Sequence, residues 1–222
     1  MRDEMQQQFD HLRSHVVAMS TQADAMLAAA MEALRSGDGD GARDVIDADV
    51  SIDQTYEQVQ HGVLALVALH GPVGTDLRQA TALMHVSLHL ERMGDYAVNA
   101  ARVVERTAGF ARDAELTERL GVMGERARGV GTDAVDAFMR ADEDAARHTA
   151  RLDDEVDRLD AEIFQRLVRL ASVDFDRLEW ATSMIRLSRH LERYADHGVD
   201  IAEQVVFVTT GSAVELSRRD GT

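Results

Sequence analysis

The sequence has neither cysteine nor lysine, and each absence removes a class of chemistry. Of its 222 residues, 24 are basic side chains of the lysine or arginine type, and every one of them is arginine. Without cysteine the chain can form no disulfide, thiolate nucleophile or thiolate metal site. Without lysine it can form no Schiff base and no Walker-type phosphate loop, because both require that residue.

Proline and aromatic residues are scarce, which favours an all-α protein. The chain has one proline, and aromatic residues make up 5% of it, whereas helix-favouring Ala, Leu, Arg and Glu are abundant. The N-terminus lacks the apolar run of a signal peptide. The longest apolar stretch, residues 63–69, is too short to cross a bilayer. We therefore expect a soluble, cytoplasmic protein with no direct membrane insertion.

The charge of the chain is strongly one-sided. Acidic side chains number 40, and the formal net charge is −16. Such a balance disfavours binding to nucleic acid or to anionic membrane surfaces. Most of these acids are expected to lie on solvated helix faces, and no nucleic-acid partner is predicted.

Breaker residues divide the chain into six expected helices. A glycine-rich segment at residues 36–41, a turn at 71–75 and a break at 107–110 interrupt the helical pattern. The break at 107–110 predicts a first domain over residues 1–108 and a second over 109–212, followed by a polar tail at 213–222. The expected helices cover about residues 6–35, 42–70, 76–106, 113–140, 142–171 and 175–208.

The two halves repeat one another. The phrase HLERMGD at residues 89–95 returns as HLERYAD at residues 190–196, 101 positions later. Asp53 likewise matches Asp157 at an offset of 104, in a segment that repeats over several positions. Because the order of the matches is kept across three helices, we predict a tandem pair of three-helix bundles.

Each half has acidic residues at helix positions where a core-facing row carries apolar residues. Glu91 continues a row of every seventh residue that begins with Leu77 and Met84, and Asp95 lies one turn further on the same helix face. In the second half Glu192 and Asp196 repeat the arrangement. The neighbouring helices supply two more pairs with the same spacing, Asp49/Asp53 and Asp153/Asp157.

Carboxylates in a core-facing row are costly unless they are paired, protonated or bound to metal. Four oxygens between packed helices suit a hard divalent or trivalent metal, namely iron, manganese or magnesium, with zinc also acceptable. Asn99 and Asp200, one turn further along, could add a ligand. The alternatives are that Arg92, Arg189 or Arg193 neutralises the acids, or that the row faces water. The predicted metal ligands are Asp49, Asp53, Glu91, Asp95, Asp153, Asp157, Glu192 and Asp196.

Histidine is not expected to join these acids. His89 and His190 each precede the glutamate by two residues, about 200° around the helix, so they point away from it. His85 and His89 have metal-ligand spacing, but the second half does not repeat the pair. We expect the histidines to be packing or solvent-exposed residues, and the methionines and Trp180 to fill the core.

An enzymatic role is disfavoured, and no catalytic or cofactor-binding residue is predicted. A di-metal oxidase of the ferritin type uses four helices with Glu-x-x-His motifs, and this sequence contains no such motif. It also lacks His-Glu-x-x-His, a glycine-rich phosphate loop and a Gly-x-Ser-x-Gly elbow. A carboxylate-bridged oxidase or metal store unrelated to phosphate is retained as the alternative function.

These motifs resemble those of the PhoU family of phosphate-uptake regulators, over roughly residues 9–208. The second half departs from the family motifs at two places. It has Asp176-Arg177-Leu178 at the turn, and it has Ala195 where the first half has Gly94, so the two sites could differ in metal affinity. The resemblance is carried by Asp49-x-x-Ile52-Asp53, Gly71-Pro72, Asp76-Leu77-Arg78, Leu90-Glu91-Arg92-Met93-Gly94-Asp95, Asp153-x-x-Val156-Asp157 and Leu191-Glu192-Arg193-Tyr194-Ala195-Asp196.

The resemblance implies two three-helix bundles with metal at the acid motifs, and a cytoplasmic role without catalysis. It implies contact with the ATPase subunit of the phosphate ABC transporter and with a membrane sensor histidine kinase. Through these partners the protein would keep the phosphate-starvation response repressed, an indirect and negative control of transcription. It also implies a homodimer.

Overall fold

Long helices make up nearly all of the computed structural model, which describes residues 2–47 and 50–216. Helices α4 and α7 have 33 residues each, a length of about 50 Å. The elements are α1 (Arg2–Ser36), α2 (Gly39–Asp47), α3 (Val50–His70), α4 (Thr75–Thr107), α5 (Ala114–Arg140), α6 (Glu143–Val173), the short 3-10 helix η1 (Phe175–Arg177) and α7 (Leu178–Thr210).

Local capping signals explain where several helices begin. Asp113 and Asp142 cap α5 and α6, since each side chain accepts a hydrogen bond from a backbone N–H three residues later. Gly74 precedes α4, which begins one residue before the expected start at residue 76, and Asp76 lies in its first turn. The helix expected over residues 42–70 is described as α2 and α3, on either side of residues 48 and 49, which lie outside the described ranges.

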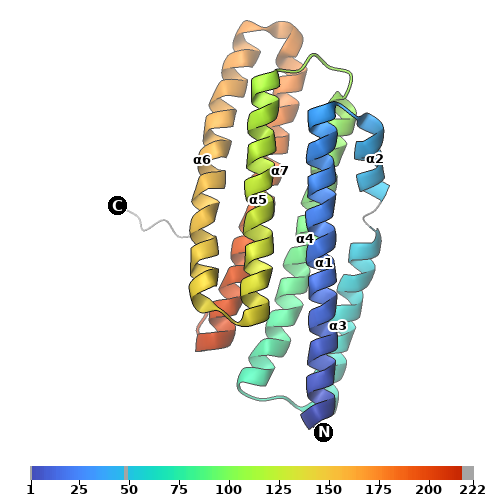
Figure 1. Cartoon of the computed structure of the whole chain (residues 1–222), viewed down its shortest axis with the longest axis vertical. Helices are drawn as coiled ribbons and strands as arrows, with labels where there is room; N and C mark the ends of the chain where they lie inside the picture. The colour runs from blue at the N-terminus through green and yellow to red at the C-terminus, as the bar shows by residue number, and fades with distance from the viewer. Residues whose placement is uncertain (1, 48–49, 217–222) are drawn as a thin grey trace.

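The helices form two bundles that pack side by side, which confirms the predicted fold class. The first contains α1 to α4 and the second α5 to α7. The bundles meet where α4 contacts α7 and where α1 contacts α5 (Figure 1). Helices α4 and α7 run in opposite directions along their contact, which we call the seam. After α7 the chain turns back at Gly211, and the backbone N–H of Leu216 donates to Glu203.

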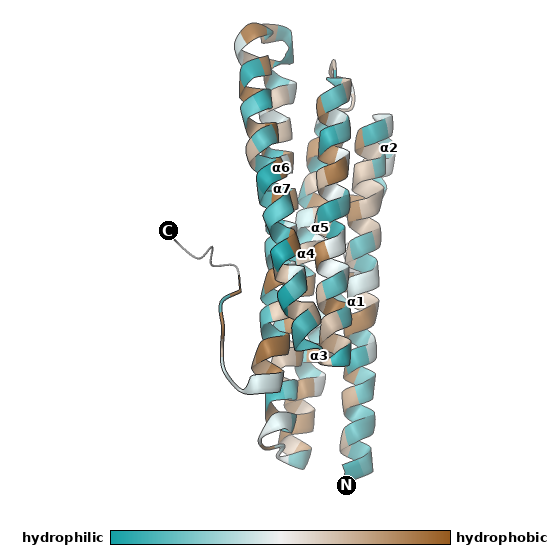
Figure 2. Cartoon of the chain, turned by 60° about the vertical axis from the view of Figure 1, so that its left-hand side comes forward, coloured by the Kyte–Doolittle hydropathy of each residue, from teal (hydrophilic) through white to brown (hydrophobic). Residues whose placement is uncertain are grey.

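One hydrophobic core runs through both bundles. It includes Phe9, Val16, Met19 and Trp180, all 2% exposed or less, and the methionine and the tryptophan were expected there. Hydrophilic and hydrophobic residues are mixed along the helices (Figure 2). Among the described residues, no helix carries an apolar segment long enough to span a membrane.

Candidate metal centre

The acids of the repeated phrase lie at the margin of the core, because their row turns gradually around the helix. Residues seven apart drift by roughly 20° per heptad on a straight α-helix. On α4 the row accordingly passes from Leu77, 43% exposed, to Val98, 1% exposed. Between them the Glu91 side chain is 17% exposed, and the Glu192 side chain has the same exposure on α7.

An arginine bridges the two acids in each copy of the phrase. In α4 the Nη1 of Arg92 lies 3.0 Å from Asp95 Oδ2, and its Nε lies 3.4 Å from Glu91 Oε2. In α7 Arg193 makes the equivalent contacts, at 3.1 Å to Asp196 and 3.6 Å to Glu192. Both arginines are more than half exposed. They therefore lie between the acid pairs and the solvent, in agreement with the alternative in which arginine neutralises the acids.

In the second half the acids of α6 and α7 act on one another through their charges, although no three of them bring ligand oxygens within 4.8 Å of one another in the described residues. Burial raises the pKa of Asp153 to about 7, and the charge of Asp157 adds to the effect. From α7, the charges of Asp196 and Glu192 act on Asp153 in the same direction. Burial also raises the pKa of Glu192, as does the charge of Asp196, against the opposing charges of the nearby arginines. The pKa of Asp196 is raised chiefly by burial as well. All four predicted acids of this half therefore influence one another.

Two buried oxygens of this group lack a hydrogen-bond donor among the described residues. They are Oδ1 of Asp153, whose side chain is buried in α6, and Oε2 of Glu192 in α7. A buried carboxylate oxygen without a donor is destabilising unless a proton or a cation compensates it. Arg193 Nε lies 3.6 Å from the Glu192 oxygen, whereas a proton or a hard cation would compensate the Asp153 oxygen, since carboxylate oxygens are ligands that such a cation prefers.

The first half is more open. Asp53 is exposed on α3, and the predicted partner Asp49 lies outside the described residues. Asp95 is 41% exposed at its side chain. Asn99, which could have added a ligand, accepts a hydrogen bond from Arg102 at 3.0 Å. The acids of the first half are thus less enclosed than those of the second.

The structure adds one acid that the sequence analysis missed. Asp160 of α6 is buried, accepts a hydrogen bond of 2.5 Å from Ser188 and lies 2.7 Å from Arg189 Nη1. The available signal was its spacing, since Asp153, Asp157 and Asp160 recur at helical intervals. Beside it a cavity of about 410 Å³ is lined by Asp157, Asp160, Ala161, Phe164, Gln165, Arg189 and Glu192.

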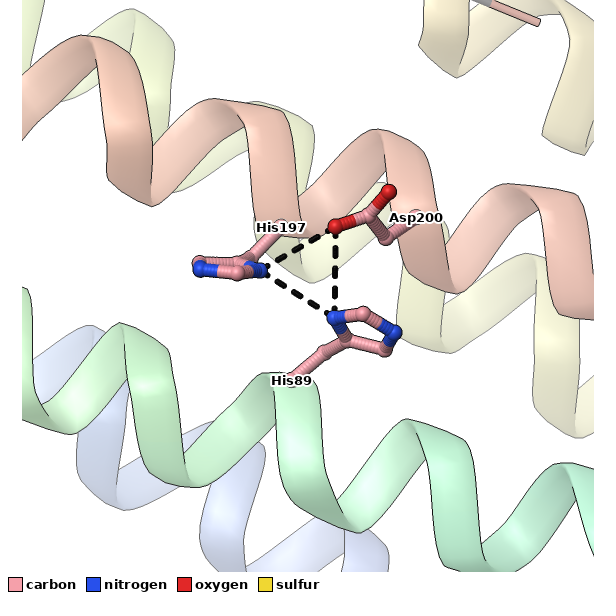
Figure 3. A group of neighbouring side chains, drawn as sticks. All are labelled: His89, His197 and Asp200. Atoms are coloured by element: carbon pink, nitrogen blue, oxygen red, sulfur yellow. Dashed lines mark hydrogen bonds and ion pairs between the residues drawn. The ribbon is translucent and has the colours of Figure 1, made fainter. Parts of the chain in front are cut away.

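A different group lies on the seam, and it includes His89, which was expected to pack or to face solvent. That histidine is packed against His197 and Asp200 of α7, so it does not merely fill space or face water (Figure 3). Within the described ranges, this is the one group in which three potential ligand atoms lie within 4.8 Å of one another. Asp200 was named as a possible additional ligand of the acid motifs. His197 was not.

Comparisons with known proteins agree with this architecture. The PhoU domain matches the chain twice, at residues 16–104 and 120–205. A PhoU homologue from Clostridium acetobutylicum, described as a phosphate-specific transport system accessory protein, is 28% identical, covering 94% of this chain and 95% of that protein. A relative of the same description from Zymomonas mobilis is 30% identical, covering 90% of this chain and 84% of that protein.

Two solved structures have the same fold. PhoU from Pseudomonas aeruginosa superposes with a TM-score of 0.87 at 28% identity, covering 93% of this chain and 99% of that one. The phosphate transport system regulatory protein PhoU from Streptococcus pneumoniae also gives a TM-score of 0.87, at 25% identity, covering 95% of this chain and 99% of that one. The repeated acid motifs, the paired bundles and the two domain matches together show that this chain belongs to the PhoU family.

Proposed function

We propose that this chain is a cytoplasmic, non-enzymatic regulator of phosphate uptake. It would act with the ATPase subunit of the phosphate ABC transporter and with a sensor histidine kinase, as a homodimer, to repress the phosphate-starvation response. The observation that carries this proposal is the match of both halves to the PhoU domain. Further support comes from full-length relatives described as accessory proteins of phosphate-specific transport.

The acid motifs are proposed to hold a hard cation, most firmly in the second half. Asp153, Asp157, Glu192 and Asp196 supply the oxygens, and the buried oxygen atoms of Asp153 and Glu192 that lack donors support the assignment. The cation would neutralise the acids and hold α6 against α7. In the first half Asp49, Asp53, Glu91 and Asp95 would form the equivalent, more open site. The resulting rigid helix faces would form a surface that partner proteins can recognise.

The regulatory role can be tested in the host cell. Deleting the gene should switch on phosphate-starvation genes in phosphate-rich medium, and restoring the chain on a plasmid should repress them again. A tagged chain should also retain the transporter ATPase or the kinase in a pull-down. Starvation genes that stay repressed in the deletion strain would contradict the role.

The metal and the alternative function need a separate experiment. Protein purified without chelator should contain iron, manganese, magnesium or zinc by elemental analysis, and a variant carrying Asp153→Asn and Glu192→Gln should contain less. Asp154→Asn, an exposed neighbour on α6, serves as the matched control. Rapid oxygen consumption with ferrous iron would instead support the oxidase alternative.

A further inference from the structure

We infer that His89, His197 and Asp200 form a binding site for a zinc-type transition-metal ion on the seam between the two bundles. Its three ligands are not among the eight acid-motif residues, although Asp196 of the motif lines the cavity beside it, and the site does not depend on the proposed role in phosphate uptake. His89 comes from α4 in the first half, whereas His197 and Asp200 come from α7 in the second (Figure 3). A bound ion would therefore link the two halves directly.

The distances suit a single ion. Nδ1 of His89 lies 3.1 Å from Nδ1 of His197 and 3.3 Å from Oδ2 of Asp200. Nδ1 of His197 lies 3.1 Å from the same Asp200 oxygen. A tetrahedral zinc ion with bonds of ~2.0–2.2 Å requires neighbouring donor atoms roughly 3.3–3.5 Å apart. Only a small relaxation separates the three atoms from that arrangement.

The chemistry of the ligands selects the class of metal. Two imidazole nitrogens with one carboxylate favour zinc or a neighbouring transition metal over magnesium or calcium, which prefer all-oxygen sites. Metal binding also requires neutral imidazole.

Surrounding groups hold the ligands and leave room for another one. The Tyr96 ring stacks on His197 at a centroid distance of 5.6 Å, which limits the orientations of that imidazole. A cavity of about 350 Å³ opens beside His197 and Asp200, large enough for a water molecule to complete the coordination. The His89 and His197 side chains are only 18% and 20% exposed. The ligands are thus preorganised, with access from solvent.

The internal repeat supplies a comparison within the same molecule. At the offset of 101 that relates α4 to α7, His89 corresponds to His190, His197 to Tyr96 and Asp200 to Asn99. His190 and Tyr96 do lie together, with ring centroids 6.0 Å apart. The duplicated fold therefore builds the same juxtaposition twice, but only one copy carries two histidines and a carboxylate. The ligand set is not an automatic result of the fold.

Zinc binding to the chelator-stripped, full-length protein tests the site. Zn²⁺ affinity would be measured by competition with a chromogenic chelator, and Co²⁺ would be added as a spectroscopic probe of nitrogen ligation. His89→Gln and His197→Gln should each weaken binding at one site roughly 100-fold or more and remove the Co²⁺ visible band. Asp200→Asn should weaken binding as well. His190→Gln, the matched control at the equivalent position, should leave affinity and band unchanged.

One further variant separates this site from the acid motifs. A chain with Asp153→Asn and Glu192→Gln should retain the Co²⁺ band, because its two histidines are intact. Loss of the band in that chain, or equal losses in His89→Gln and His190→Gln, would overturn the assignment. Circular dichroism of each metal-free variant checks folding, and His197→Gln provides an independent reading if His89→Gln does not fold.

Discussion

Asp24 and Arg128 occupy equivalent positions in the two halves, 104 residues apart, and bind each other. The Arg128 guanidinium donates from Nε and Nη2 to the two carboxylate oxygens of Asp24, each at 2.8 Å. The pair joins α1 to α5, and about two thirds or more of each side chain is shielded from solvent. Equivalent positions meet only where the symmetry axis of the repeat passes between them. Here the duplicated positions have opposite charges, which turns a potential repulsion into a bidentate ion pair.

Reversing one charge of this pair should destabilise the protein, and reversing both should restore it. Asp24→Arg places two guanidinium groups together and is expected to lower the free energy of unfolding by about 1–3 kcal/mol. Adding Arg128→Asp recreates the pair in the opposite sense and should recover most of that loss. Urea denaturation of the single and double variants measures both values. A double variant as unstable as the sum of the singles would show that the pair contributes no coupling.

The buried Asp153 predicts how stability depends on pH in the absence of metal. Its pKa is about 7 in the folded chain, above the value of about 3.9 in an unfolded one. The native state therefore holds this proton more tightly, and the stabilisation is complete below about pH 4 and lost as the pH rises through 7. In chelator, Asp153→Asn should exceed the parent in unfolding free energy at pH 8 by about 1–3 kcal/mol.

The same comparison at pH 5 provides the check, because the parent is then largely protonated at Asp153 and the advantage should shrink. Asp154→Asn, one residue along and exposed, should show no such pH dependence. Thermal unfolding at both pH values gives the result. An equal destabilisation by Asp153→Asn at pH 5 and pH 8 would indicate that the carboxylate is satisfied in its charged form.

Local signals were sufficient to predict most of the fold. The helix starts expected near residues 76, 113 and 142 agree with the observed N-cap positions Gly74, Asp113 and Asp142, because helix starts depend largely on neighbouring residues. The side of the helix that the heptad row faces was harder to predict from the sequence. Leu77 was assigned to a core-facing row but is 43% exposed. Whether a row remains buried depends on its drift relative to the partner helices, and that relation comes from the assembled bundle.

The candidate sites likewise contain some residues that the sequence indicates and others that only the packing of the helices brings together. The acid pairs could be recognised because each repeats in both halves, and repetition is visible in the sequence. His197 could not be found in this way, since its counterpart in the first half is Tyr96 and the repeat therefore does not mark the position. Its contact with His89 spans 108 residues and arises only when α4 packs against α7. The group of His89, His197 and Asp200 therefore exists because the two halves carry different residues at equivalent positions.

Close packing of α7 against α5 should make Gly198 intolerant of a side chain. A Cβ at Gly198 would lie 2.9 Å from Val130 Cγ1 and 3.1 Å from the backbone nitrogen of Gly131. Because backbone cannot move aside cheaply, Gly198→Ala is expected to cost about 1–3 kcal/mol in unfolding free energy. Gly129→Ala is the control, since nothing lies within 4 Å of its Cβ. That change should stabilise the helix by roughly 0.5–1 kcal/mol.

The repeat also predicts that a second metal site can be created. Tyr96→His with Asn99→Asp gives the first half the side chains that His197 and Asp200 provide in the second, opposite His190 instead of His89. The position retains an aromatic ring that can pack beside His197. If ligand identity alone distinguishes the two locations, the double variant should bind one more Zn²⁺ ion per chain than the parent, with a larger Co²⁺ absorption. Adding His190→Gln should remove the new ion and leave the original one. An unchanged number of bound Zn²⁺ ions in a folded double variant would mean that the backbone geometry around His190 differs from that around His89. The two copies would then share the placement of their helices, but in the first half the three side chains would not come close enough to bind one ion.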